Sequence, residues 1–100
     1  MFVQMFIGEL LDRERLEDLR AAIACDLFPQ LMGERGVHGV QLIAEEGESV
    51  LLILTISWCS RDRAVAWASS ADYRKLRCLA YPAMRGEFIM KLFRVQAVAA

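Results

Sequence analysis

The segment from Val50 to Trp67, VLLILTISWCSRDRAVAW, restricts the possible folds of this chain more than any other part. Its first nine residues predict a strand in which only a threonine and a serine interrupt the apolar side chains. Strands of this composition are covered on both faces. A chain of 100 residues seldom covers both faces of a strand by itself. We therefore expect helices on one face and a second copy of the chain on the other.

The composition agrees with an oligomer. Hydrophobic residues make up 56% of the chain and charged residues 25%, against a usual apolar share of about 45–50%. The length is typical of one domain, so we expect a single domain spanning residues 1–100. Excess apolar content with ordinary charge indicates apolar surface at an interface between copies, and we expect a homodimer.

Charge and hydropathy argue against two classes of partner. The net charge is −1 with acids and bases interspersed, so no nucleic-acid surface is predicted. The longest uncharged apolar run, Val50 to Cys59, is about half of the ~20 residues that cross a bilayer, so no membrane segment is expected. The N-terminal residues show no basic leader and meet Glu9 and Asp12 early, which argues against a secretory signal and for a cytoplasmic location.

The cysteines are expected to be reduced in that compartment, and buried and inert. They are Cys25, Cys59 and Cys78, and their spacing matches no zinc motif. The chain also contains a single histidine. We therefore expect no metal site.

Hydrophobic periodicity predicts four strands, at Phe2–Ile7, Val37–Ala44, Val50–Trp58 and Glu87–Val98. Alternation along the third strand divides its side chains between two faces. One face carries Val50, Leu52, Leu54, Ile56 and Trp58, and the other carries Leu51, Ile53, Thr55 and Ser57. The fourth strand contains charged residues, which favours an edge position.

Two helical segments separate these strands. The first follows a candidate N-cap at Asp12 and is expected to end or kink near Phe28, because Pro29 lacks an N–H group. The second begins at the cap residue Ser60, and a second capping motif at Ser70 predicts a kink or restart before the helix continues to about Tyr81.

The resulting order is β-α-β-β-α-β. With right-handed crossovers it gives a ferredoxin-like antiparallel sheet of the α+β class, with both helices on one face and the first and third strands in the centre. These two strands are also the most apolar, which supports their central positions independently. We predict that the open faces of two such sheets pack together as a dimeric α+β barrel.

A group of motif residues lies at the end of the third strand and in the helix that follows it. They are Trp58-Cys59-Ser60, Trp67, Ser70, Tyr73 and Arg74, and Gly36 precedes the second strand. In this pattern the chain resembles the antibiotic-biosynthesis-monooxygenase family of dimeric α+β barrels. The resemblance extends to the length and the element order of the whole chain.

The resemblance implies a pocket between sheet and helices in each subunit. Activities of that family include cofactor-free oxygenation of polycyclic aromatic phenols and quinols, and oxidative haem degradation. Trp58 would match the pocket tryptophan of the haem-degrading branch. Arg77 stands where that branch has its haem-ligating histidine, and the chain contains no asparagine to match its strand-one asparagine. Haem degradation is therefore disfavoured, and we expect no cofactor.

Five side chains are candidates for lining a ligand pocket: Gln4, Phe6, Leu54, Trp58 and Trp67. The Trp58 ring can stack on a planar aromatic ligand or fill the core. Trp67 lies on the alanine-rich face of its helix and is expected to pack in the core. Gln4 lies on a central strand, and a buried amide needs partners, so we expect it to face a polar ligand or to bond across the dimer.

Three side chains are catalytic candidates. Tyr73 and Arg77 are four residues apart and therefore neighbours on one helix face, where they can position a phenolate; a solvated helix surface is the alternative. His38 is the only histidine and can act as a general base near neutral pH. Its position at the start of an edge strand, beside a glycine, favours simple exposure to solvent.

The first functional hypothesis is a cofactor-independent monooxygenase for a small aromatic phenol or quinol. The alternative is a non-catalytic homodimeric module that binds an apolar small ligand. Both require an open pocket around Trp58 and Trp67. RNA binding by a sheet of the same element order requires exposed aromatic and basic side chains, and the first and third predicted strands contain no lysine or arginine.

Overall fold

The computed structural model describes residues 1–99 and contains one four-stranded antiparallel sheet. The strands are β1 (Phe2–Glu9), β2 (Val37–Ala44), β3 (Leu51–Trp58) and β4 (Ile89–Arg94), in the spatial order β2-β3-β1-β4. The predicted ferredoxin-like fold is therefore confirmed, with the first and third strands in the centre. The fourth strand is an edge strand, as expected, but it is shorter than the predicted Glu87–Val98.

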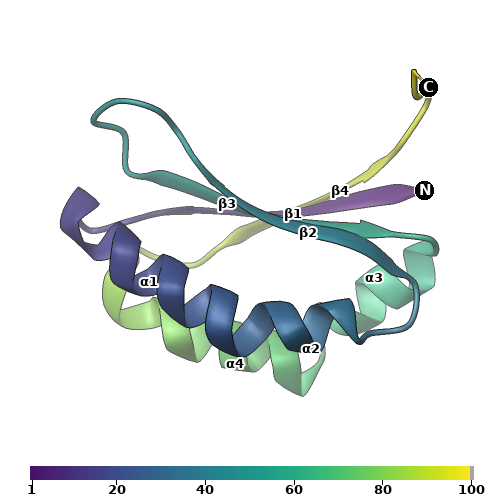
Figure 1. Ribbon diagram of the computed structural model, residues 1–100, viewed down its shortest axis with the longest axis horizontal. Helices are drawn as coiled ribbons and strands as arrows, with labels where there is room; N and C mark the ends of the chain where they lie inside the picture. Colours follow the sequence, from purple (N-terminus) through teal and green to yellow (C-terminus); the bar gives the residue numbers. More distant parts are fainter. Residues whose placement is uncertain (100) are drawn as a thin grey trace.

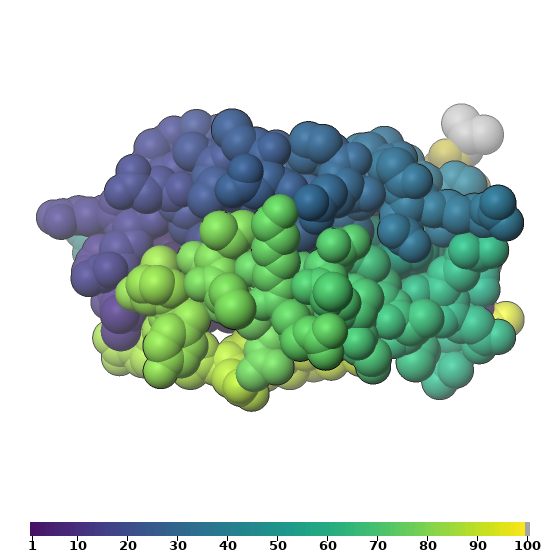
Figure 2. All heavy atoms as spheres, turned by 90° about the horizontal axis from the view of Figure 1, so that it is seen from below, coloured from purple at the N-terminus to yellow at the C-terminus, as the bar shows by residue number. Residues whose placement is uncertain are grey.

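All helices lie on one face of the sheet, and nothing in the described chain covers the other face (Figure 1). The α-helical segments are α1 (Leu16–Ala22), α2 (Phe28–Met32), α3 (Arg61–Trp67) and α4 (Ala71–Ala80). Seen from the helical side, α1 and α2 run alongside α4 (Figure 2). None of the described helices is long and apolar enough to cross a membrane.

The strand register fixes which side chains face the helices. Phe6 is paired with Leu54 and Phe2 with Trp58 across β1 and β3, and directly opposed residues of paired strands share a face. Phe6, Leu54, Ile56 and Trp58 are buried beneath the helices. The face assignment predicted for the third strand is therefore confirmed.

The opposite face of the sheet carries apolar side chains that remain accessible. One row crosses all four strands and consists of Ile43, Ile53, Ile7 and Ile89, in that order. The two members on the edge strands are exposed, Ile43 by 45% and Ile89 by 62%. A surface of this kind in a single chain is typical of an interface.

The first helical segment was expected to end or kink near Phe28. It does not end there but continues to Met32, and a π-helical turn at Ile23–Leu27 interrupts the α-helix immediately before Phe28. The π turn shifts the hydrogen-bond register, so that the Phe28 N–H bonds to the Ile23 carbonyl. Pro29 then falls in the first turn of α2, where a missing N–H leaves no intrahelical bond unmade.

Asp12 does not cap this segment either. Its side chain makes no capping hydrogen bond; instead its carboxylate pairs with the Arg15 side chain at 3.1 Å. A short 3₁₀ turn, Arg13–Arg15, connects it to α1. The arginine guanidinium competes for the carboxylate oxygen that a cap would use.

The predicted break in the second helical segment is confirmed. The Ser60 hydroxyl accepts a hydrogen bond from the Arg63 N–H at 3.5 Å, and the Ser70 hydroxyl accepts one from the Tyr73 N–H at 3.2 Å. The Ser70 hydroxyl also donates to the Trp67 carbonyl at 2.6 Å, which closes the end of α3. The two caps thus set separate starts for α3 and α4.

The expectation of buried cysteines is wrong. Cys25, Cys59 and Cys78 are free and exposed, because the first and third lie on helix faces that point away from the sheet and the second follows the end of β3. Among the described residues, no group of three or more histidine, cysteine or acidic side chains is arranged to hold a metal ion.

One buried polar network links the two central strands to α3. The amide of Gln4 is fully buried; its Nε2 donates to the Ala64 carbonyl at 3.0 Å, and its Oε1 accepts from the Trp58 Nε1 at 3.0 Å. Gln4 therefore finds its partners within its own chain, whereas we expected a ligand or a second subunit. A buried amide with both ends paired fixes the relative positions of the elements it joins.

Replacing Gln4 by Met tests this network. The Gln4→Met substitution keeps the side-chain length but leaves the buried Trp58 N–H without an acceptor, so we expect a loss of about 1–3 kcal/mol in the free energy of unfolding. Urea unfolding followed by tryptophan fluorescence measures it. The control, Gln96→Met in the exposed C-terminal segment, should change stability by less than about 0.5 kcal/mol. Equal stabilities of the two variants would show that the network contributes nothing.

Candidate functional site

The five predicted pocket side chains form part of the hydrophobic interior. Gln4, Phe6, Leu54 and Trp58 are at most 1% exposed, and Trp67 is 4% exposed. None of the hollows described below is lined by the first four. The space around Trp58 is occupied by protein, so the open pocket that both functional hypotheses placed at this ring is not present in this conformation. Either function therefore needs a site elsewhere in the molecule.

Three aromatic rings pack together at the inner face of the sheet. The ring centroids of Phe6 and Tyr73 are 4.9 Å apart, those of Phe6 and Trp67 are 5.5 Å apart, and those of Trp67 and Tyr73 are 5.7 Å apart. Edge and tilted contacts of this kind stabilise beyond the area buried. The cluster joins β1 to the end of α3 and the start of α4.

Tyr73 forms the outer member of this cluster and is partly buried. Burial raises the pKa of its hydroxyl above the ordinary value of 10.0, while the positive charge of Arg77 lowers the pKa and the negative charge of Glu87 raises it. The phenol therefore keeps its proton at neutral pH. It is available as a hydrogen-bond donor near the Arg77 side chain.

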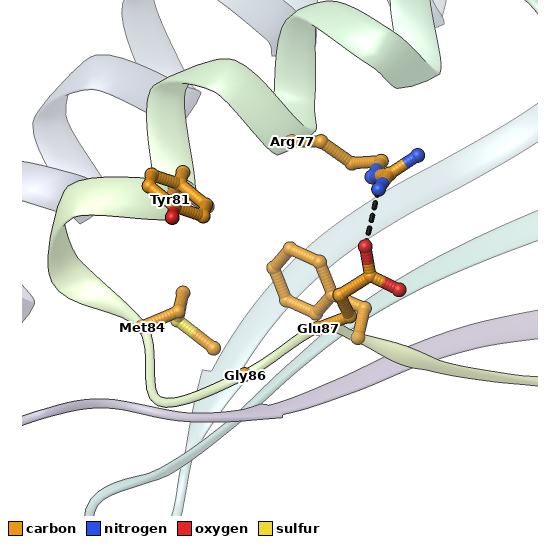
Figure 3. A pocket seen from close by; sticks show the side chains of 7 residues that line it. Arg77, Tyr81, Met84, Gly86 and Glu87 are labelled. Carbon is orange, nitrogen blue, oxygen red and sulfur yellow. Dashed lines mark hydrogen bonds and ion pairs between the residues drawn. The ribbon is translucent and has the colours of Figure 1, made fainter.

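Arg77 lies one turn after Tyr73 on α4 and pairs with Glu87, which precedes β4. The guanidinium extends from α4 towards the Glu87 carboxylate across an opening that Tyr81 and Met84 border (Figure 3). Sequence reasoning assigned Glu87 only to the start of a strand. The ten-residue separation gives no local sign of the pair, because the chain turns back between the two residues.

A small cavity and a larger hollow meet at this ion pair. The cavity has a volume of about 30 Å³, room for one or two water molecules, and lies among Arg77, Ala80, Tyr81, Met84, Gly86, Glu87 and Phe88 (Figure 3). The hollow, of about 310 Å³, is lined by Arg74, Arg77, Cys78, Tyr81 and Glu87. Arg77, Tyr81 and Glu87 line both spaces. We call this place the α4–β4 site.

The Tyr81 ring is 80% exposed beside the α4–β4 site. A large aromatic ring left in solvent next to a hollow is an available surface on which a planar ligand can stack. The Arg77 guanidinium adds positive charge at the same opening. Arg74 lines the hollow as well, so the site offers one aromatic surface and two cations, and Tyr73 adds a hydrogen-bond donor close by.

His38 lies away from these residues. It is exposed on β2, at the edge of the sheet opposite β4. The register between β2 and β3 shifts between Val37 and Gly39, so His38 is the extra residue of a β-bulge. The structure therefore brings Tyr73 and Arg77 together and leaves His38 outside their reach.

Another hollow borders Trp67 where α3 ends and α4 begins. It has a volume of about 320 Å³ and is lined by Glu34, Arg63, Ala66, Trp67, Ser70 and Asp72. The buried Nε1 of Trp67 has no hydrogen-bond partner among the described residues. A third hollow, of about 220 Å³, lies between the start of α1 and the end of α4.

Comparison with known proteins supports the fold. No family model and no curated protein sequence matches the chain. Solved structures do match over nearly the whole length.

A monooxygenase of Streptomyces coelicolor, solved in complex with the ligand nanaomycin D, superposes with a TM-score of 0.81 at 13% identity and covers 99% of this chain and 90% of its own. A proposed antibiotic biosynthesis monooxygenase of Nitrosomonas europaea gives a TM-score of 0.79 at 15% identity, covering 97% of this chain and 100% of its own.

A further structure with that proposed activity, from Bordetella bronchiseptica, gives a TM-score of 0.76 at 24% identity and covers 96% of this chain and 98% of its own. Identities at this level show a common fold. The chain has the fold of the antibiotic biosynthesis monooxygenase structures. The motif residues from Trp58 to Arg74 predicted this fold through their resemblance to that family.

Proposed function

We propose that the protein is a cofactor-independent monooxygenase that acts on a small aromatic phenol or quinol at the α4–β4 site. The observation that carries the proposal is the arrangement of Arg77 with Tyr73 one turn before it, at the edge of the aromatic cluster. The shared fold with a monooxygenase solved with nanaomycin D supports it.

In this proposal the protein favours the anion that reacts with oxygen. The substrate ring stacks on Tyr81, the Arg77 guanidinium stabilises the phenolate, and the Tyr73 hydroxyl donates a hydrogen bond. For a phenol with hydrogen at the para carbon, one atom of O₂ becomes the new carbonyl oxygen of a quinone. The other oxygen atom leaves as water, which takes up the hydroxyl hydrogen and the para hydrogen of the phenol. The substrate supplies all four electrons that reduce O₂.

A non-catalytic module that binds an apolar small ligand is the second candidate function. The observation in its favour is the position of His38, which places no imidazole near Tyr73 and Arg77. Among residues 1–99, the only carboxylate that borders the α4–β4 site is that of Glu87, which is already paired with Arg77. Such a site can bind an aromatic ring without a group free to accept its proton.

We also propose that two copies pack through the open sheet face, as a dimeric α+β barrel. The row of isoleucines across the four strands supports this, because its cover by a partner removes apolar surface from water at ~25 cal/mol per Å². Thr55, which also points to this face, is only 8% exposed. The open-face residues of the two central strands that pair with one another are uncharged: Val3 with Ser57, Met5 with Thr55, and Ile7 with Ile53.

Oxygen uptake tests the catalytic proposal. With 1-naphthol and anthrone, which carry hydrogen at the carbon that is oxidised, we expect consumption of O₂ above the protein-free blank for at least one compound. Arg77→Gln should lower kcat/KM by roughly 100-fold, the usual cost of losing a group that stabilises a developing anion. Arg35→Gln, in the exposed loop before β2, is the matched control and should leave the rate unchanged.

No uptake with any compound would contradict the monooxygenase. Recovery of a bound phenol unchanged from the same samples would then favour the binding module.

Sedimentation velocity tests the dimer. We expect the wild type to sediment at twice the chain mass of 11.3 kDa. Ile53→Lys places a charge in the middle of the open sheet face and should give a monomer. Val65→Lys, at an apolar side chain that is 41% exposed on α3, should remain dimeric. A wild type that sediments as a monomer, or an Ile53→Lys variant that remains dimeric, would overturn the proposal.

A further inference from the structure

Residues Gly86–Phe88 are attached to the sheet differently from their neighbours. Immediately before them, the Arg85 N–H bonds to the Glu9 carbonyl at 2.7 Å. Immediately after them, Ile89 pairs with Ile7 at the start of β4. Between these two attachments the three residues make no backbone-to-backbone hydrogen bond within the described chain. We call Gly86–Phe88 the strap.

Side-chain contacts hold the strap in place. The Phe88 ring packs directly on the backbone of Gly8, where an added methyl group would lie 2.9 Å from a ring carbon and would also overlap the Met84 side chain. Glu87 forms the ion pair with Arg77. Gly86 has a φ of +79°, which glycine adopts freely, and no atom lies within 4 Å of the place where its side chain would be.

Two spaces of very different size meet at Glu87 of the strap. The strap residues border the cavity of about 30 Å³, and Arg77, Tyr81 and Glu87 border both this cavity and the hollow of about 310 Å³. Small-molecule sites have volumes of about 300–1,000 Å³. Movement of Glu87 away from Arg77 would join the two spaces into one site with Arg77 in its wall.

The ion pair that closes this site is weakly held. The Arg77 and Glu87 side chains are 48% and 76% exposed, and exposed pairs are screened by solvent and contribute little to stability. A segment without backbone hydrogen bonds, held by an exposed pair and one ring contact, opens at low free energy.

We propose that the Glu87 carboxylate occupies the position on Arg77 that the acidic group of an aromatic ligand takes, and that the strap opens when such a ligand displaces it. This inference rests on the proposed use of the α4–β4 site and adds the ligand class, a planar aromatic anion, and its internal competitor. The guanidinium bonds to one Glu87 carboxylate oxygen through a terminal nitrogen, and it can present the same donors to a phenolate, carboxylate or sulfonate.

The competition has a charge-specific consequence. When Glu87 is removed, an anionic ligand no longer has to displace a carboxylate from Arg77. In the wild type the ligand binds only those molecules in which Arg77 is not paired with Glu87. The apparent affinity therefore rises by a factor equal to the inverse of that fraction. A neutral ligand of the same shape gains nothing from a free guanidinium. A general loosening of the strap would instead raise the affinity for both ligands.

The test uses two fluorescent probes with the same aromatic skeleton. 8-Anilinonaphthalene-1-sulfonate is anionic, and N-phenyl-1-naphthylamine is neutral. For Glu87→Gln we expect binding of the sulfonate probe to tighten about three- to sixfold relative to wild type, as expected when the competitor is an exposed ion pair. The neutral probe should change by less than twofold. Combining Glu87→Gln with Arg77→Gln should abolish the gain.

Glu48→Gln is the matched control, because it removes one exposed carboxylate from the turn between β2 and β3. It makes the same change in net charge and should leave both dissociation constants unchanged. Equal affinities of wild type and Glu87→Gln for the sulfonate would overturn the proposal. So would an equal gain for both probes, or a gain that persists without Arg77.

These titrations need no turnover, so their outcome is independent of the oxygenase proposal. A gain in affinity for the anionic probe alone, without oxygen uptake, would contradict the oxygenase proposal and support the strap proposal. Oxygen uptake without such a gain would contradict the strap proposal and support the oxygenase proposal.

Discussion

The hydrogen bond from the Trp58 indole to Gln4 is the interaction on which the rest of the structure depends. It joins the two central strands, and the second bond of the same amide, to Ala64, attaches α3 to them. With these groups locked together and Phe6 packed beside them, the interior beneath the helices is filled by the chain's own side chains. A ligand therefore has no place at the centre of the fold.

Because the interior is filled, the candidate site lies at the edge where α4 faces the start of β4. There the aromatic cluster ends in Tyr73, Arg77 reaches across to Glu87, and the strap interrupts the backbone pairing of β1 and β4. The same edge contains the exposed ring of Tyr81 (Figure 3). Charge, aromatic surface and a weakly attached segment coincide at this one place.

Local sequence signals predicted the elements well and the site partially. Alternation identified the buried face of β3, and the serine caps identified the separate starts of α3 and α4, because both signals act within a few residues. The π turn before Pro29 was missed, since it is an adjustment of helix register to packing. Gln4 was recognised as a buried amide in need of partners. Its actual partners, Trp58 and Ala64, depend on strand register and helix placement, which no local sequence signal reports. Glu87 was missed as the partner of Arg77 because this pair also depends on how distant segments are placed.

Chemical-shift mapping with 1-naphthol is the most direct test of where a ligand binds. In ¹⁵N-labelled protein, the account predicts that the largest amide shifts occur at Arg77 and across Gly86–Phe88. The indole N–H of Trp58, which is held by Gln4, should remain almost unchanged. Largest shifts at the Trp58 indole, or on the open sheet face around Ile53, would contradict the placement of the site between α4 and β4.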